Sequence, residues 1–219
     1  RWRWLGTKTL LFAPKNRFPM ATVYTVDIPA GTKSTWGNAL NQTKRWIFST
    51  PPPQVTDNYP VNGPTTRNPL FFVGFDQRIN PAAVLRTIKL TATGRATALR
   101  LAKPEEIEKD EAVRQRVKAA QSERWLAFRA ADASEQALLA DTNYTVQVGP
   151  GTPSAEGPRT SEKPHTFTFR TYGPLTLTEH RCGYQERCEP FMTCRGCKSA
   201  TTATSSTCKA QRKGARLTA

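Results

Sequence analysis

The chain contains an internal repeat, and a repeat restricts the possible folds more than any other feature of a sequence. Residues 21–37, ATVYTVDIPAGTKSTWG, align without a gap with residues 141–157, DTNYTVQVGPGTPSAEG, at an offset of 120. Eight of the seventeen aligned positions are identical. The similarity resumes with WIFST at residues 46–50 and FTFRT at residues 167–171, one residue further out of step. The chain therefore holds two copies of one structural unit.

Each copy predicts two neighbouring strands. The runs that start at Tyr24 and Tyr144 alternate apolar and polar residues and are rich in β-branched side chains, which is typical of a strand with one buried face. A loop rich in Pro and Gly follows, and then a second alternating run, WIFST or FTFRT. Two such runs around a loop predict antiparallel strands that close a module. A module that closes twice predicts tandem β-sandwiches.

Between the two copies we expect further strands at residues 68–75, 84–92, 97–101 and 124–128. Residues 104–123 predict a helix, because Pro104 suits the first helical position, acidic residues crowd the first half and basic residues the second. The apolar stripe of this helix is thin, so we expect an insertion that lies outside the sandwich.

The predicted fold class is all-β, with tandem immunoglobulin-like β-sandwich modules and one helical insertion. Residues 1–53 are interpreted as the C-terminal part of a first module, residues 54–172 as a complete module, and residues 173–219 as the start of a third. The third module runs into a tail that is poor in large apolar residues, so we expect disorder there and no contribution to folding. A frameshifted end and a basic tail with its own role both remain open.

The strings FFVGFDQRINPAAV, NYTVQVGPGTPSAEGP and FTFRTYGPL resemble the tandem immunoglobulin-like modules in the N-terminal part of bacterial alpha-2-macroglobulin-like proteins. The resemblance covers roughly residues 5–190. It implies a large periplasmic or surface-exposed parent that entraps proteases, with a cleavable bait segment and often a Cys-x-x-Gln thioester. Cys182 and Cys208 match only the bare thioester spacing, without the flanking residues of the family. We therefore expect neither a bait segment nor a thioester in this chain.

The resemblance also implies the partners and the location. The expected partners are other modules of the parent chain and, through the intact parent, proteases. The chain begins with Arg1 rather than Met, so we expect an internal fragment whose export signal lies elsewhere. The expected location is the periplasm or cell surface, with membrane contact only through an anchor outside the fragment.

The strong positive charge motivates one alternative function. The formal net charge is +15 and the start Arg1-Trp2-Arg3-Trp4 mixes basic and aromatic residues, as in proteins that bind polyanions or nucleic acids. The basic residues do not cluster on a recognisable reading element, so we expect no nucleic-acid partner. A surface adhesion module is a further alternative.

No catalytic residue, cofactor or metal is predicted. Only two histidines occur, and His165 has no nucleophile motif near it, so we interpret it as a solvent-facing loop residue and expect no enzymatic activity. Zinc is one interpretation of Cys188, Cys194, Cys197 and Cys208, but the chain has a single CxxC pair where structural zinc sites usually have two. The resemblance instead implies a disulfide between Cys182 and Cys188, which suits an exported protein.

Three residues are assigned structural roles. Tyr24 and Tyr144 occupy matching strand positions, where a buried ring with its hydroxyl bonded to a nearby loop is common in these sandwiches. Asp76 opens the turn at residues 76–81, and a turn-capping role explains it without a calcium ion.

Overall fold

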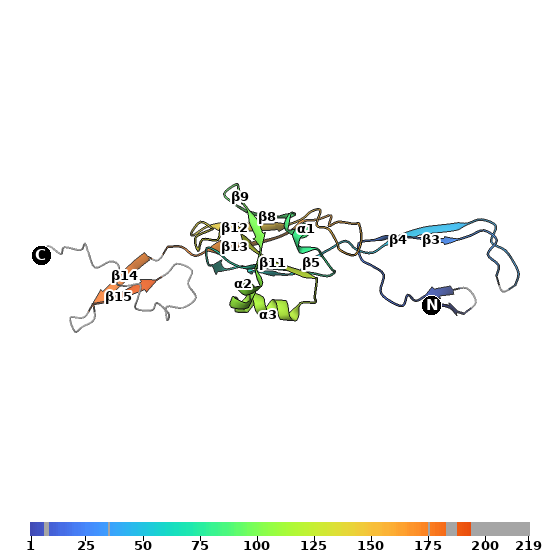
Figure 1. Cartoon of the computed structure of the whole chain (residues 1–219), viewed down its shortest axis with the longest axis horizontal. Coiled ribbons are helices and arrows are strands. Elements are labelled where there is room, and N and C mark those ends of the chain that lie inside the picture. The colour runs from blue at the N-terminus through green and yellow to red at the C-terminus, as the bar shows by residue number, and fades with distance from the viewer. Residues whose placement is uncertain (7–8, 35, 175, 183–187, 194–219) are drawn as a thin grey trace.

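The computed structural model describes residues 1–6, 9–34, 36–174, 176–182 and 188–193. Figure 1 shows a complete β-sandwich in the middle of an elongated chain, with two hairpins on its N-terminal side and one on its C-terminal side. The all-β fold class is thus confirmed, because helices are few and short. The predicted tail beyond Thr193, including Cys194, Cys197 and Cys208, lies outside the described residues.

The complete module is built from two sheets that pack face to face. One sheet has four strands in the order β10 (Leu99–Leu101), β11 (Trp125–Ala130), β7 (Phe71–Phe75) and β5 (Val55–Tyr59). The other has five strands in the order β6 (Pro64–Thr65), β13 (His165–Thr171), β12 (Asn143–Val148), β8 (Ile88–Ala92) and β9 (Arg95–Thr97). All neighbours are antiparallel except β13 and β6, which are parallel.

The core lies between the two sheets. β12 and β13 alternate buried and less buried residues, as expected for strands with one face toward the core. β7 is buried on both faces: Phe71, Val73 and Phe75 face the other sheet, while Phe72 lies in a second apolar cluster with Val113. This second cluster explains why the sequence of β7 is continuously apolar.

The helical insertion covers the outer face of the four-stranded sheet. It consists of two helices, α2 (Pro104–Lys109) and α3 (Glu111–Ala119), so the prediction of a single helix over residues 104–123 is wrong. The break is at Asp110, whose backbone is extended and whose carboxylate accepts a hydrogen bond from the amide of Val113. An aspartate in this position begins a new helix by capping its free N–H groups.

Two other sequence predictions are also wrong in detail. A helix, α1 (Pro81–Leu85), precedes β8, so that strand begins at Ile88 rather than at residue 84. Asn80 caps α1 by accepting hydrogen bonds from the amides of Ala82 and Ala83, and proline suits the following position. The strand predicted at residues 97–101 is split, because β9 and β10 belong to different sheets.

The repeat is visible as two hairpins with the same register. β3 (Val23–Ile28) pairs antiparallel with β4 (Lys44–Ser49), as β12 does with β13. Tyr24 lies opposite Phe48 with stacked rings 5.1 Å apart, and Tyr144 lies opposite Phe169 with stacked rings 5.4 Å apart. Cross-strand aromatic pairs of this kind stabilise a hairpin.

Two further hairpins flank these elements. β1 (Trp2–Leu5) pairs with β2 (Thr9–Phe12), and β14 (Thr176–Cys182) pairs with β15 (Cys188–Thr193). The register of β14 and β15 places the backbone of Cys182 opposite that of Cys188. The disulfide between them stays a prediction.

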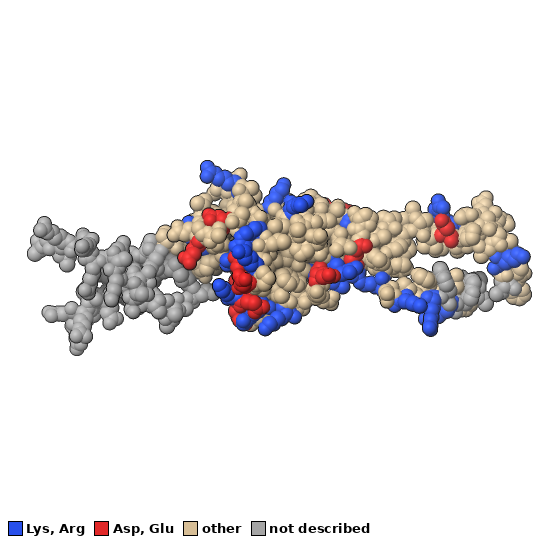
Figure 2. All heavy atoms as spheres, viewed as in Figure 1, with Lys and Arg blue, Asp and Glu red and all other residues tan. Residues whose placement is uncertain are grey.

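Basic and acidic side chains are interspersed on the surface of the described residues. Figure 2 shows Lys and Arg spread over the two N-terminal hairpins and the complete module, with Asp and Glu beside several of them. Close ion pairs include Arg45 with Asp27 at 2.6 Å and Arg170 with Asp141 at 2.7 Å. The positive charge is therefore divided among scattered positions rather than gathered on one element.

Glu106 ties the insertion to the four-stranded sheet. Its carboxylate accepts hydrogen bonds from Arg100 at 2.6 and 2.8 Å, from the amide of Lys103 at 2.8 Å and from Arg129 at 3.3 Å. The hydrogen bonds from Arg100 are the largest cause of a pKa lowered to about 2, and they outweigh the opposing effect of burial.

We expect Glu106→Gln to lower the free energy of unfolding at neutral pH and to remove part of its dependence on pH. The pKa of Glu106 is lower in the folded state than its usual value of 4.5, so the ionised carboxylate stabilises the fold fully above that value. This stabilisation decreases as the pH falls toward about 2. Urea unfolding should show a wild-type advantage at pH 7 that shrinks at pH 3. The control is Glu108→Gln, at an exposed position, which should unfold like the wild type at both pH values. A wild-type advantage over Glu106→Gln that did not change with pH would contradict the lowered pKa of Glu106.

Candidate functional site at the module junction

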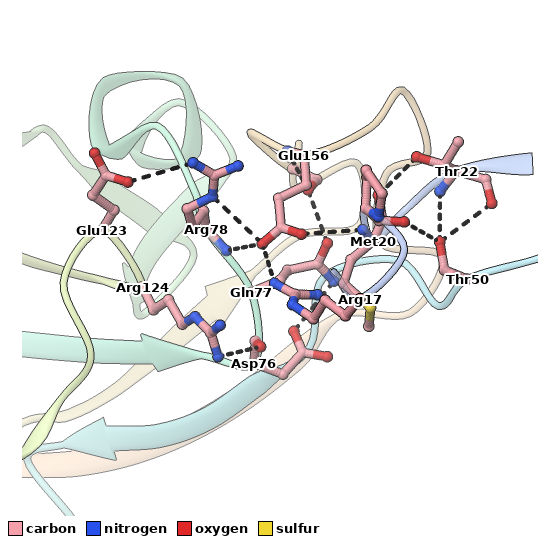
Figure 3. A network of polar contacts seen from close by, with 12 residues as sticks. Arg17, Met20, Thr22, Thr50, Asp76, Gln77, Arg78, Glu123, Arg124 and Glu156 are labelled. Carbon is pink, nitrogen blue, oxygen red and sulfur yellow. Dashed lines mark hydrogen bonds and ion pairs between the residues drawn. The ribbon is translucent and has the colours of Figure 1, made fainter. Parts of the chain in front are cut away.

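A network of polar contacts joins the first repeat hairpin, β3–β4, to the complete module (Figure 3). The complete module contributes residues 151–161, between β12 and β13, which we call the docking loop. The hairpin contributes residues 19–22 and 49–51, which lie where β3 begins and β4 ends and which we call the first base. Because the repeat assigns these parts to different modules, their contacts form an interface between modules.

Glu156 is the centre of this interface. One carboxylate oxygen accepts hydrogen bonds from the amide of Arg78 at 3.0 Å and the guanidinium of Arg17 at 2.6 Å, and the other accepts from the amide of Met20 at 3.1 Å. The side chain is only 3% exposed. Burial acts most strongly on its pKa and raises it, but the hydrogen bonds from Arg78, Met20 and Arg17 together outweigh burial and lower the pKa. A buried carboxylate thus stays ionised and joins both modules.

Gly157 allows the two backbones to approach closely. A Cβ atom at this position would lie 2.2 Å from the hydroxyl of Thr22 and 2.5 Å from the carbonyl oxygens of both Ala21 and Met20. Such distances are far below van der Waals contact, and two of the three atoms belong to the backbone. The interface in this form therefore requires glycine.

Arg159 completes the contact on the other side of the first base. Its amide donates to the carbonyl of Ala21 at 2.9 Å, and its guanidinium donates to the carbonyl of Thr50 and the hydroxyl of Ser49, both at 2.8 Å. Glu162 holds the same guanidinium at 3.1 Å. The docking loop thus binds the base through both its backbone and its side chains.

Gln77 connects the docking loop to the linker between the modules. Its fully buried side chain accepts a hydrogen bond from the hydroxyl of Ser154 at 2.8 Å and donates to the carbonyl of Pro51 at 3.4 Å. A buried amide with partners on both sides fixes their relative position.

Asp76 lies beside this network and does not have the predicted role. Its carboxylate accepts from the amide of Gln54 at 3.0 Å, and its own amide donates to the Gln54 carbonyl at 3.2 Å. It therefore holds the linker, whereas Asn80 caps the helix that follows the turn. The sequence predicted a role within the turn because only neighbouring residues can be read from it, whereas the partner of Asp76, Gln54, is 22 residues away.

The first base is repeated at the far end of the complete module. Residues 139–142 and 171–172, which we call the second base, have the same hydrogen bonds. The amide of Thr22 donates to the hydroxyl of Thr50 at 3.0 Å, and the amide of Thr142 donates to the hydroxyl of Thr171 at the same distance.

The backbone conformation of the two bases agrees as well. Ala21 has φ +54° and Asp141 has φ +49°, a region that residues other than glycine rarely adopt. The amide of Ala21 donates to Pro51 at 2.9 Å, and that of Asp141 donates to Tyr172 at 3.1 Å. The similarity of the repeats therefore extends from the strands to these unusual turns.

A family model described as bacterial Ig-like domain matches residues 49–171. This chain belongs to the bacterial Ig-like domain family. The match covers the complete Ig-like module and ends at the last residue of β13. It bears out the Ig-like part of the sequence resemblance and gives no support to alpha-2-macroglobulins in particular.

Solved structures similar to this Ig-like chain include two of a surface-layer protein. One is titled the structure of surface layer protein SbsC, domains 1–6, with 15% identity and a TM-score of 0.32. The other is the crystal structure of the S-layer protein rSbsC(31–844), with 18% identity and a TM-score of 0.32. Each match covers 58% of this chain, which spans 15% of the length of the other protein. No curated protein matches the chain.

The two repeat tyrosines differ in burial. Tyr144 is 3% exposed in the core of the Ig-like module, and its hydroxyl accepts a hydrogen bond from the amide of Leu139 at 2.8 Å. Tyr24, predicted to be buried, is half-buried, and its hydroxyl donates to Pro19 at 3.0 Å. The reason is that β3–β4 forms a two-stranded sheet, and within the described residues no second sheet covers it.

The remaining candidates do not form a chemical site. His165 begins β13 and is half-buried, with its Nε2 atom 3.3 Å from Asn58, so the prediction of a solvent-facing loop residue is wrong. The described residues contain no cluster of His, Cys, Asp and Glu that could hold a metal ion. No described helix is long and apolar enough to cross a membrane.

The residues at the centre of the junction were not singled out from the sequence. Glu156 belongs to a phrase, GTPSAEGP, that contributed only to a family resemblance, and Arg159 directly follows that phrase. The available signal was the glycine shared by both copies of the repeat, Gly37 and Gly157, in a loop otherwise free to vary. A repeated loop glycine indicates close approach of another backbone.

Proposed function

We propose that this chain is a non-catalytic structural segment of a bacterial cell-envelope protein, in which the junction holds successive Ig-like modules in one orientation. The observation that carries this proposal is Glu156, a buried carboxylate whose hydrogen-bond donors come from both modules. Breaking a buried charged contact exposes unpaired groups, so the ordered junction is favoured over a flexible one.

The linker supports a rigid junction. Residues 51–53 are three consecutive prolines, which favour an extended and stiff backbone. The carbonyl of Pro51 also accepts hydrogen bonds from Ala21 on one side and Gln77 on the other. A stiff linker with bonded ends limits rotation between the modules it connects.

The narrower proposal is that the parent is an alpha-2-macroglobulin-like protease trap, in which these modules brace the part that carries the bait. This proposal depends on the sequence resemblance alone. The proposed location is the periplasm or cell surface, and the proposed partners are neighbouring modules and, through the parent, proteases. Polyanion binding is a weaker candidate, because basic side chains are scattered and several are paired with carboxylates (Figure 2).

The test of a rigid junction is Glu156→Ala. We expect the amides of Met20 and Arg78 to lose their acceptor and to exchange with solvent about 10- to 150-fold faster, because hydrogen bonds to a charged group contribute about 1.5–3 kcal/mol. Hydrogen exchange measured by NMR would also show whether the β3–β4 hairpin then tumbles independently of the Ig-like module.

The matched control is Glu162→Ala. This glutamate follows the docking loop, its side chain is 72% exposed, and its one hydrogen bond and ion pair among the described residues is with Arg159, so its loss should leave both amides protected. Equal protection in wild type and Glu156→Ala would show that the junction does not depend on this carboxylate, and the proposal of a rigid spacer would then fail.

A further inference from the structure

The repeat places a second copy of each half of the junction on the chain. Residues 31–34 and 36–40, which we call the first loop, correspond to the docking loop of the complete module. The second base corresponds to the first base. In the described residues neither of these halves takes part in a junction like that of Glu156.

The first loop has the same stem as the docking loop. The amide of Gly31 donates to Leu40 at 2.8 Å and that of Leu40 to Thr32 at 2.9 Å; the equivalent bonds, Gly151 to Ser161 and Ser161 to Thr152, measure 2.8 and 3.0 Å. An isolated bridge pairs Lys33 with Ala39, as another pairs Pro153 with Thr160. Both loops therefore present their tips in a similar frame.

The first loop exposes one large aromatic side chain. Trp36 stands at the position of Glu156 and is 88% exposed. A Cβ atom on Gly37 would have no neighbour within 4 Å, whereas one on the equivalent Gly157 would collide with the first base. Tryptophan is enriched at protein interfaces, because its ring buries a large apolar area.

The second base exposes one large apolar side chain at the corresponding place. Leu139 is 56% exposed at the position of Pro19, and Ala137 replaces Arg17, the ion-pair partner of Glu156. The carbonyl of Asp141 accepts no hydrogen bond among the described residues, although the equivalent carbonyl of Ala21 accepts one from Arg159. Where Trp36 replaces Glu156 on the loop, Ala137 thus replaces Arg17 beside the base.

We propose that the first loop of one copy of this chain docks onto the second base of another copy, head to tail, in the geometry of the internal junction. Trp36 packs against Leu139, Gly37 lies against the backbone at Asp141, and a loop amide donates to the free carbonyl. Because the two surfaces differ, each bound copy leaves one loop and one base free, and the association continues as an open chain. The inference rests on the proposed role of the junction as a device that couples modules.

The test uses two variants of the full chain under reducing conditions. Leu139→Asp keeps the first loop and places a charge on the second base, and Trp36→Ser keeps the second base and removes the main contact of the loop. Both residues are largely exposed, so both variants should fold. An unchanged NMR signal of fluorine-labelled Trp125 would verify this.

We expect sedimentation of the wild type to show a mass that increases with concentration beyond that of a dimer. Each variant alone should remain a monomer, with an association constant at least about tenfold lower, because a buried Trp is among the strongest contributors to an interface. An equimolar mixture of the two variants should associate and stop at the dimer.

The fluorine signals identify the contact. When labelled Leu139→Asp is titrated with unlabelled Trp36→Ser, the signal of Trp36 should shift saturably and those of the other tryptophans should not. Unlabelled Leu139→Asp should cause no shift.

A wild type that stays monomeric at millimolar concentration, or a mixture that does not associate, would overturn the inference. If Glu156→Ala still loosens the internal junction in that case, the proposed function stands and only the docking between copies fails.

Discussion

Replacing Tyr144 by Ala is expected to destabilise the complete Ig-like module by about 3–5 kcal/mol, the usual cost of removing a large buried aromatic side chain. The ring of Tyr144 is buried and stacks on Phe169, and its hydroxyl accepts the amide of Leu139. The replacement leaves a cavity between the two sheets and a backbone donor without its partner. Urea unfolding followed by circular dichroism measures the change.

The repeat supplies the matched control for this replacement. Tyr24→Ala removes the same atoms from the same strand position and the same stacked pair, but its ring is half-buried outside the complete module. The free energy of unfolding of the complete module should therefore stay within about 0.5 kcal/mol of that of the wild type. Equal losses for both variants would mean that burial by the second sheet is not what distinguishes the two tyrosines.

Replacing Gly157 by Ala is expected to open the junction between the modules. The added methyl group would meet the carbonyl oxygens of Met20 and Ala21 at 2.5 Å, and neither can move without displacing the start of β3. Forcing atoms into a filled site costs about 1–3 kcal/mol, so the docking loop should withdraw from the base rather than accept the overlap. The amide of Arg159, which donates to Ala21, should exchange about 5- to 150-fold faster.

The control for this variant is Ala155→Val, which adds carbon atoms to an exposed position two residues earlier in the same loop. It should leave the protection of Arg159 unchanged. Neither variant touches the core, so the unfolding midpoint of the complete module should be unaffected in both. If Gly157→Ala kept the Arg159 amide protected, the close approach of the two backbones would not be needed for docking.

The parts of the fold that the sequence predicted are those that local patterns encode. The alternating runs at Tyr24 and Tyr144 predicted paired strands, and the structure contains β3–β4 and β12–β13 in one register. The helical insertion was predicted from the order of its charges, but the break at Asp110 was not. Asp110 is one of several acidic residues in this segment, and it caps a new helix only because the backbone is extended there.

The candidate site could be predicted only in part. Gly37 and Gly157 were visible as a repeated pair, but the partner of Gly157 lies about 135 residues earlier in the chain, at Thr22. Asp76 was assigned to its own turn because only neighbouring residues could be considered, whereas its carboxylate bonds to the linker at Gln54. Contacts between distant segments have no signature in the composition of either segment.

By itself, the sequence determined the period of the repeat, the strands with one buried face and the all-β class, since these follow from side-chain periodicity and backbone preference. The tertiary structure decided which repeated residues are buried and which are exposed. Tyr24 and Tyr144 are the same residue in the same pattern, yet only Tyr144 faces a second sheet. Likewise, Glu156 stays ionised in a buried site because donors from two modules converge on it. Burial and electrostatics depend on what approaches from elsewhere in the chain, so a single segment cannot encode them.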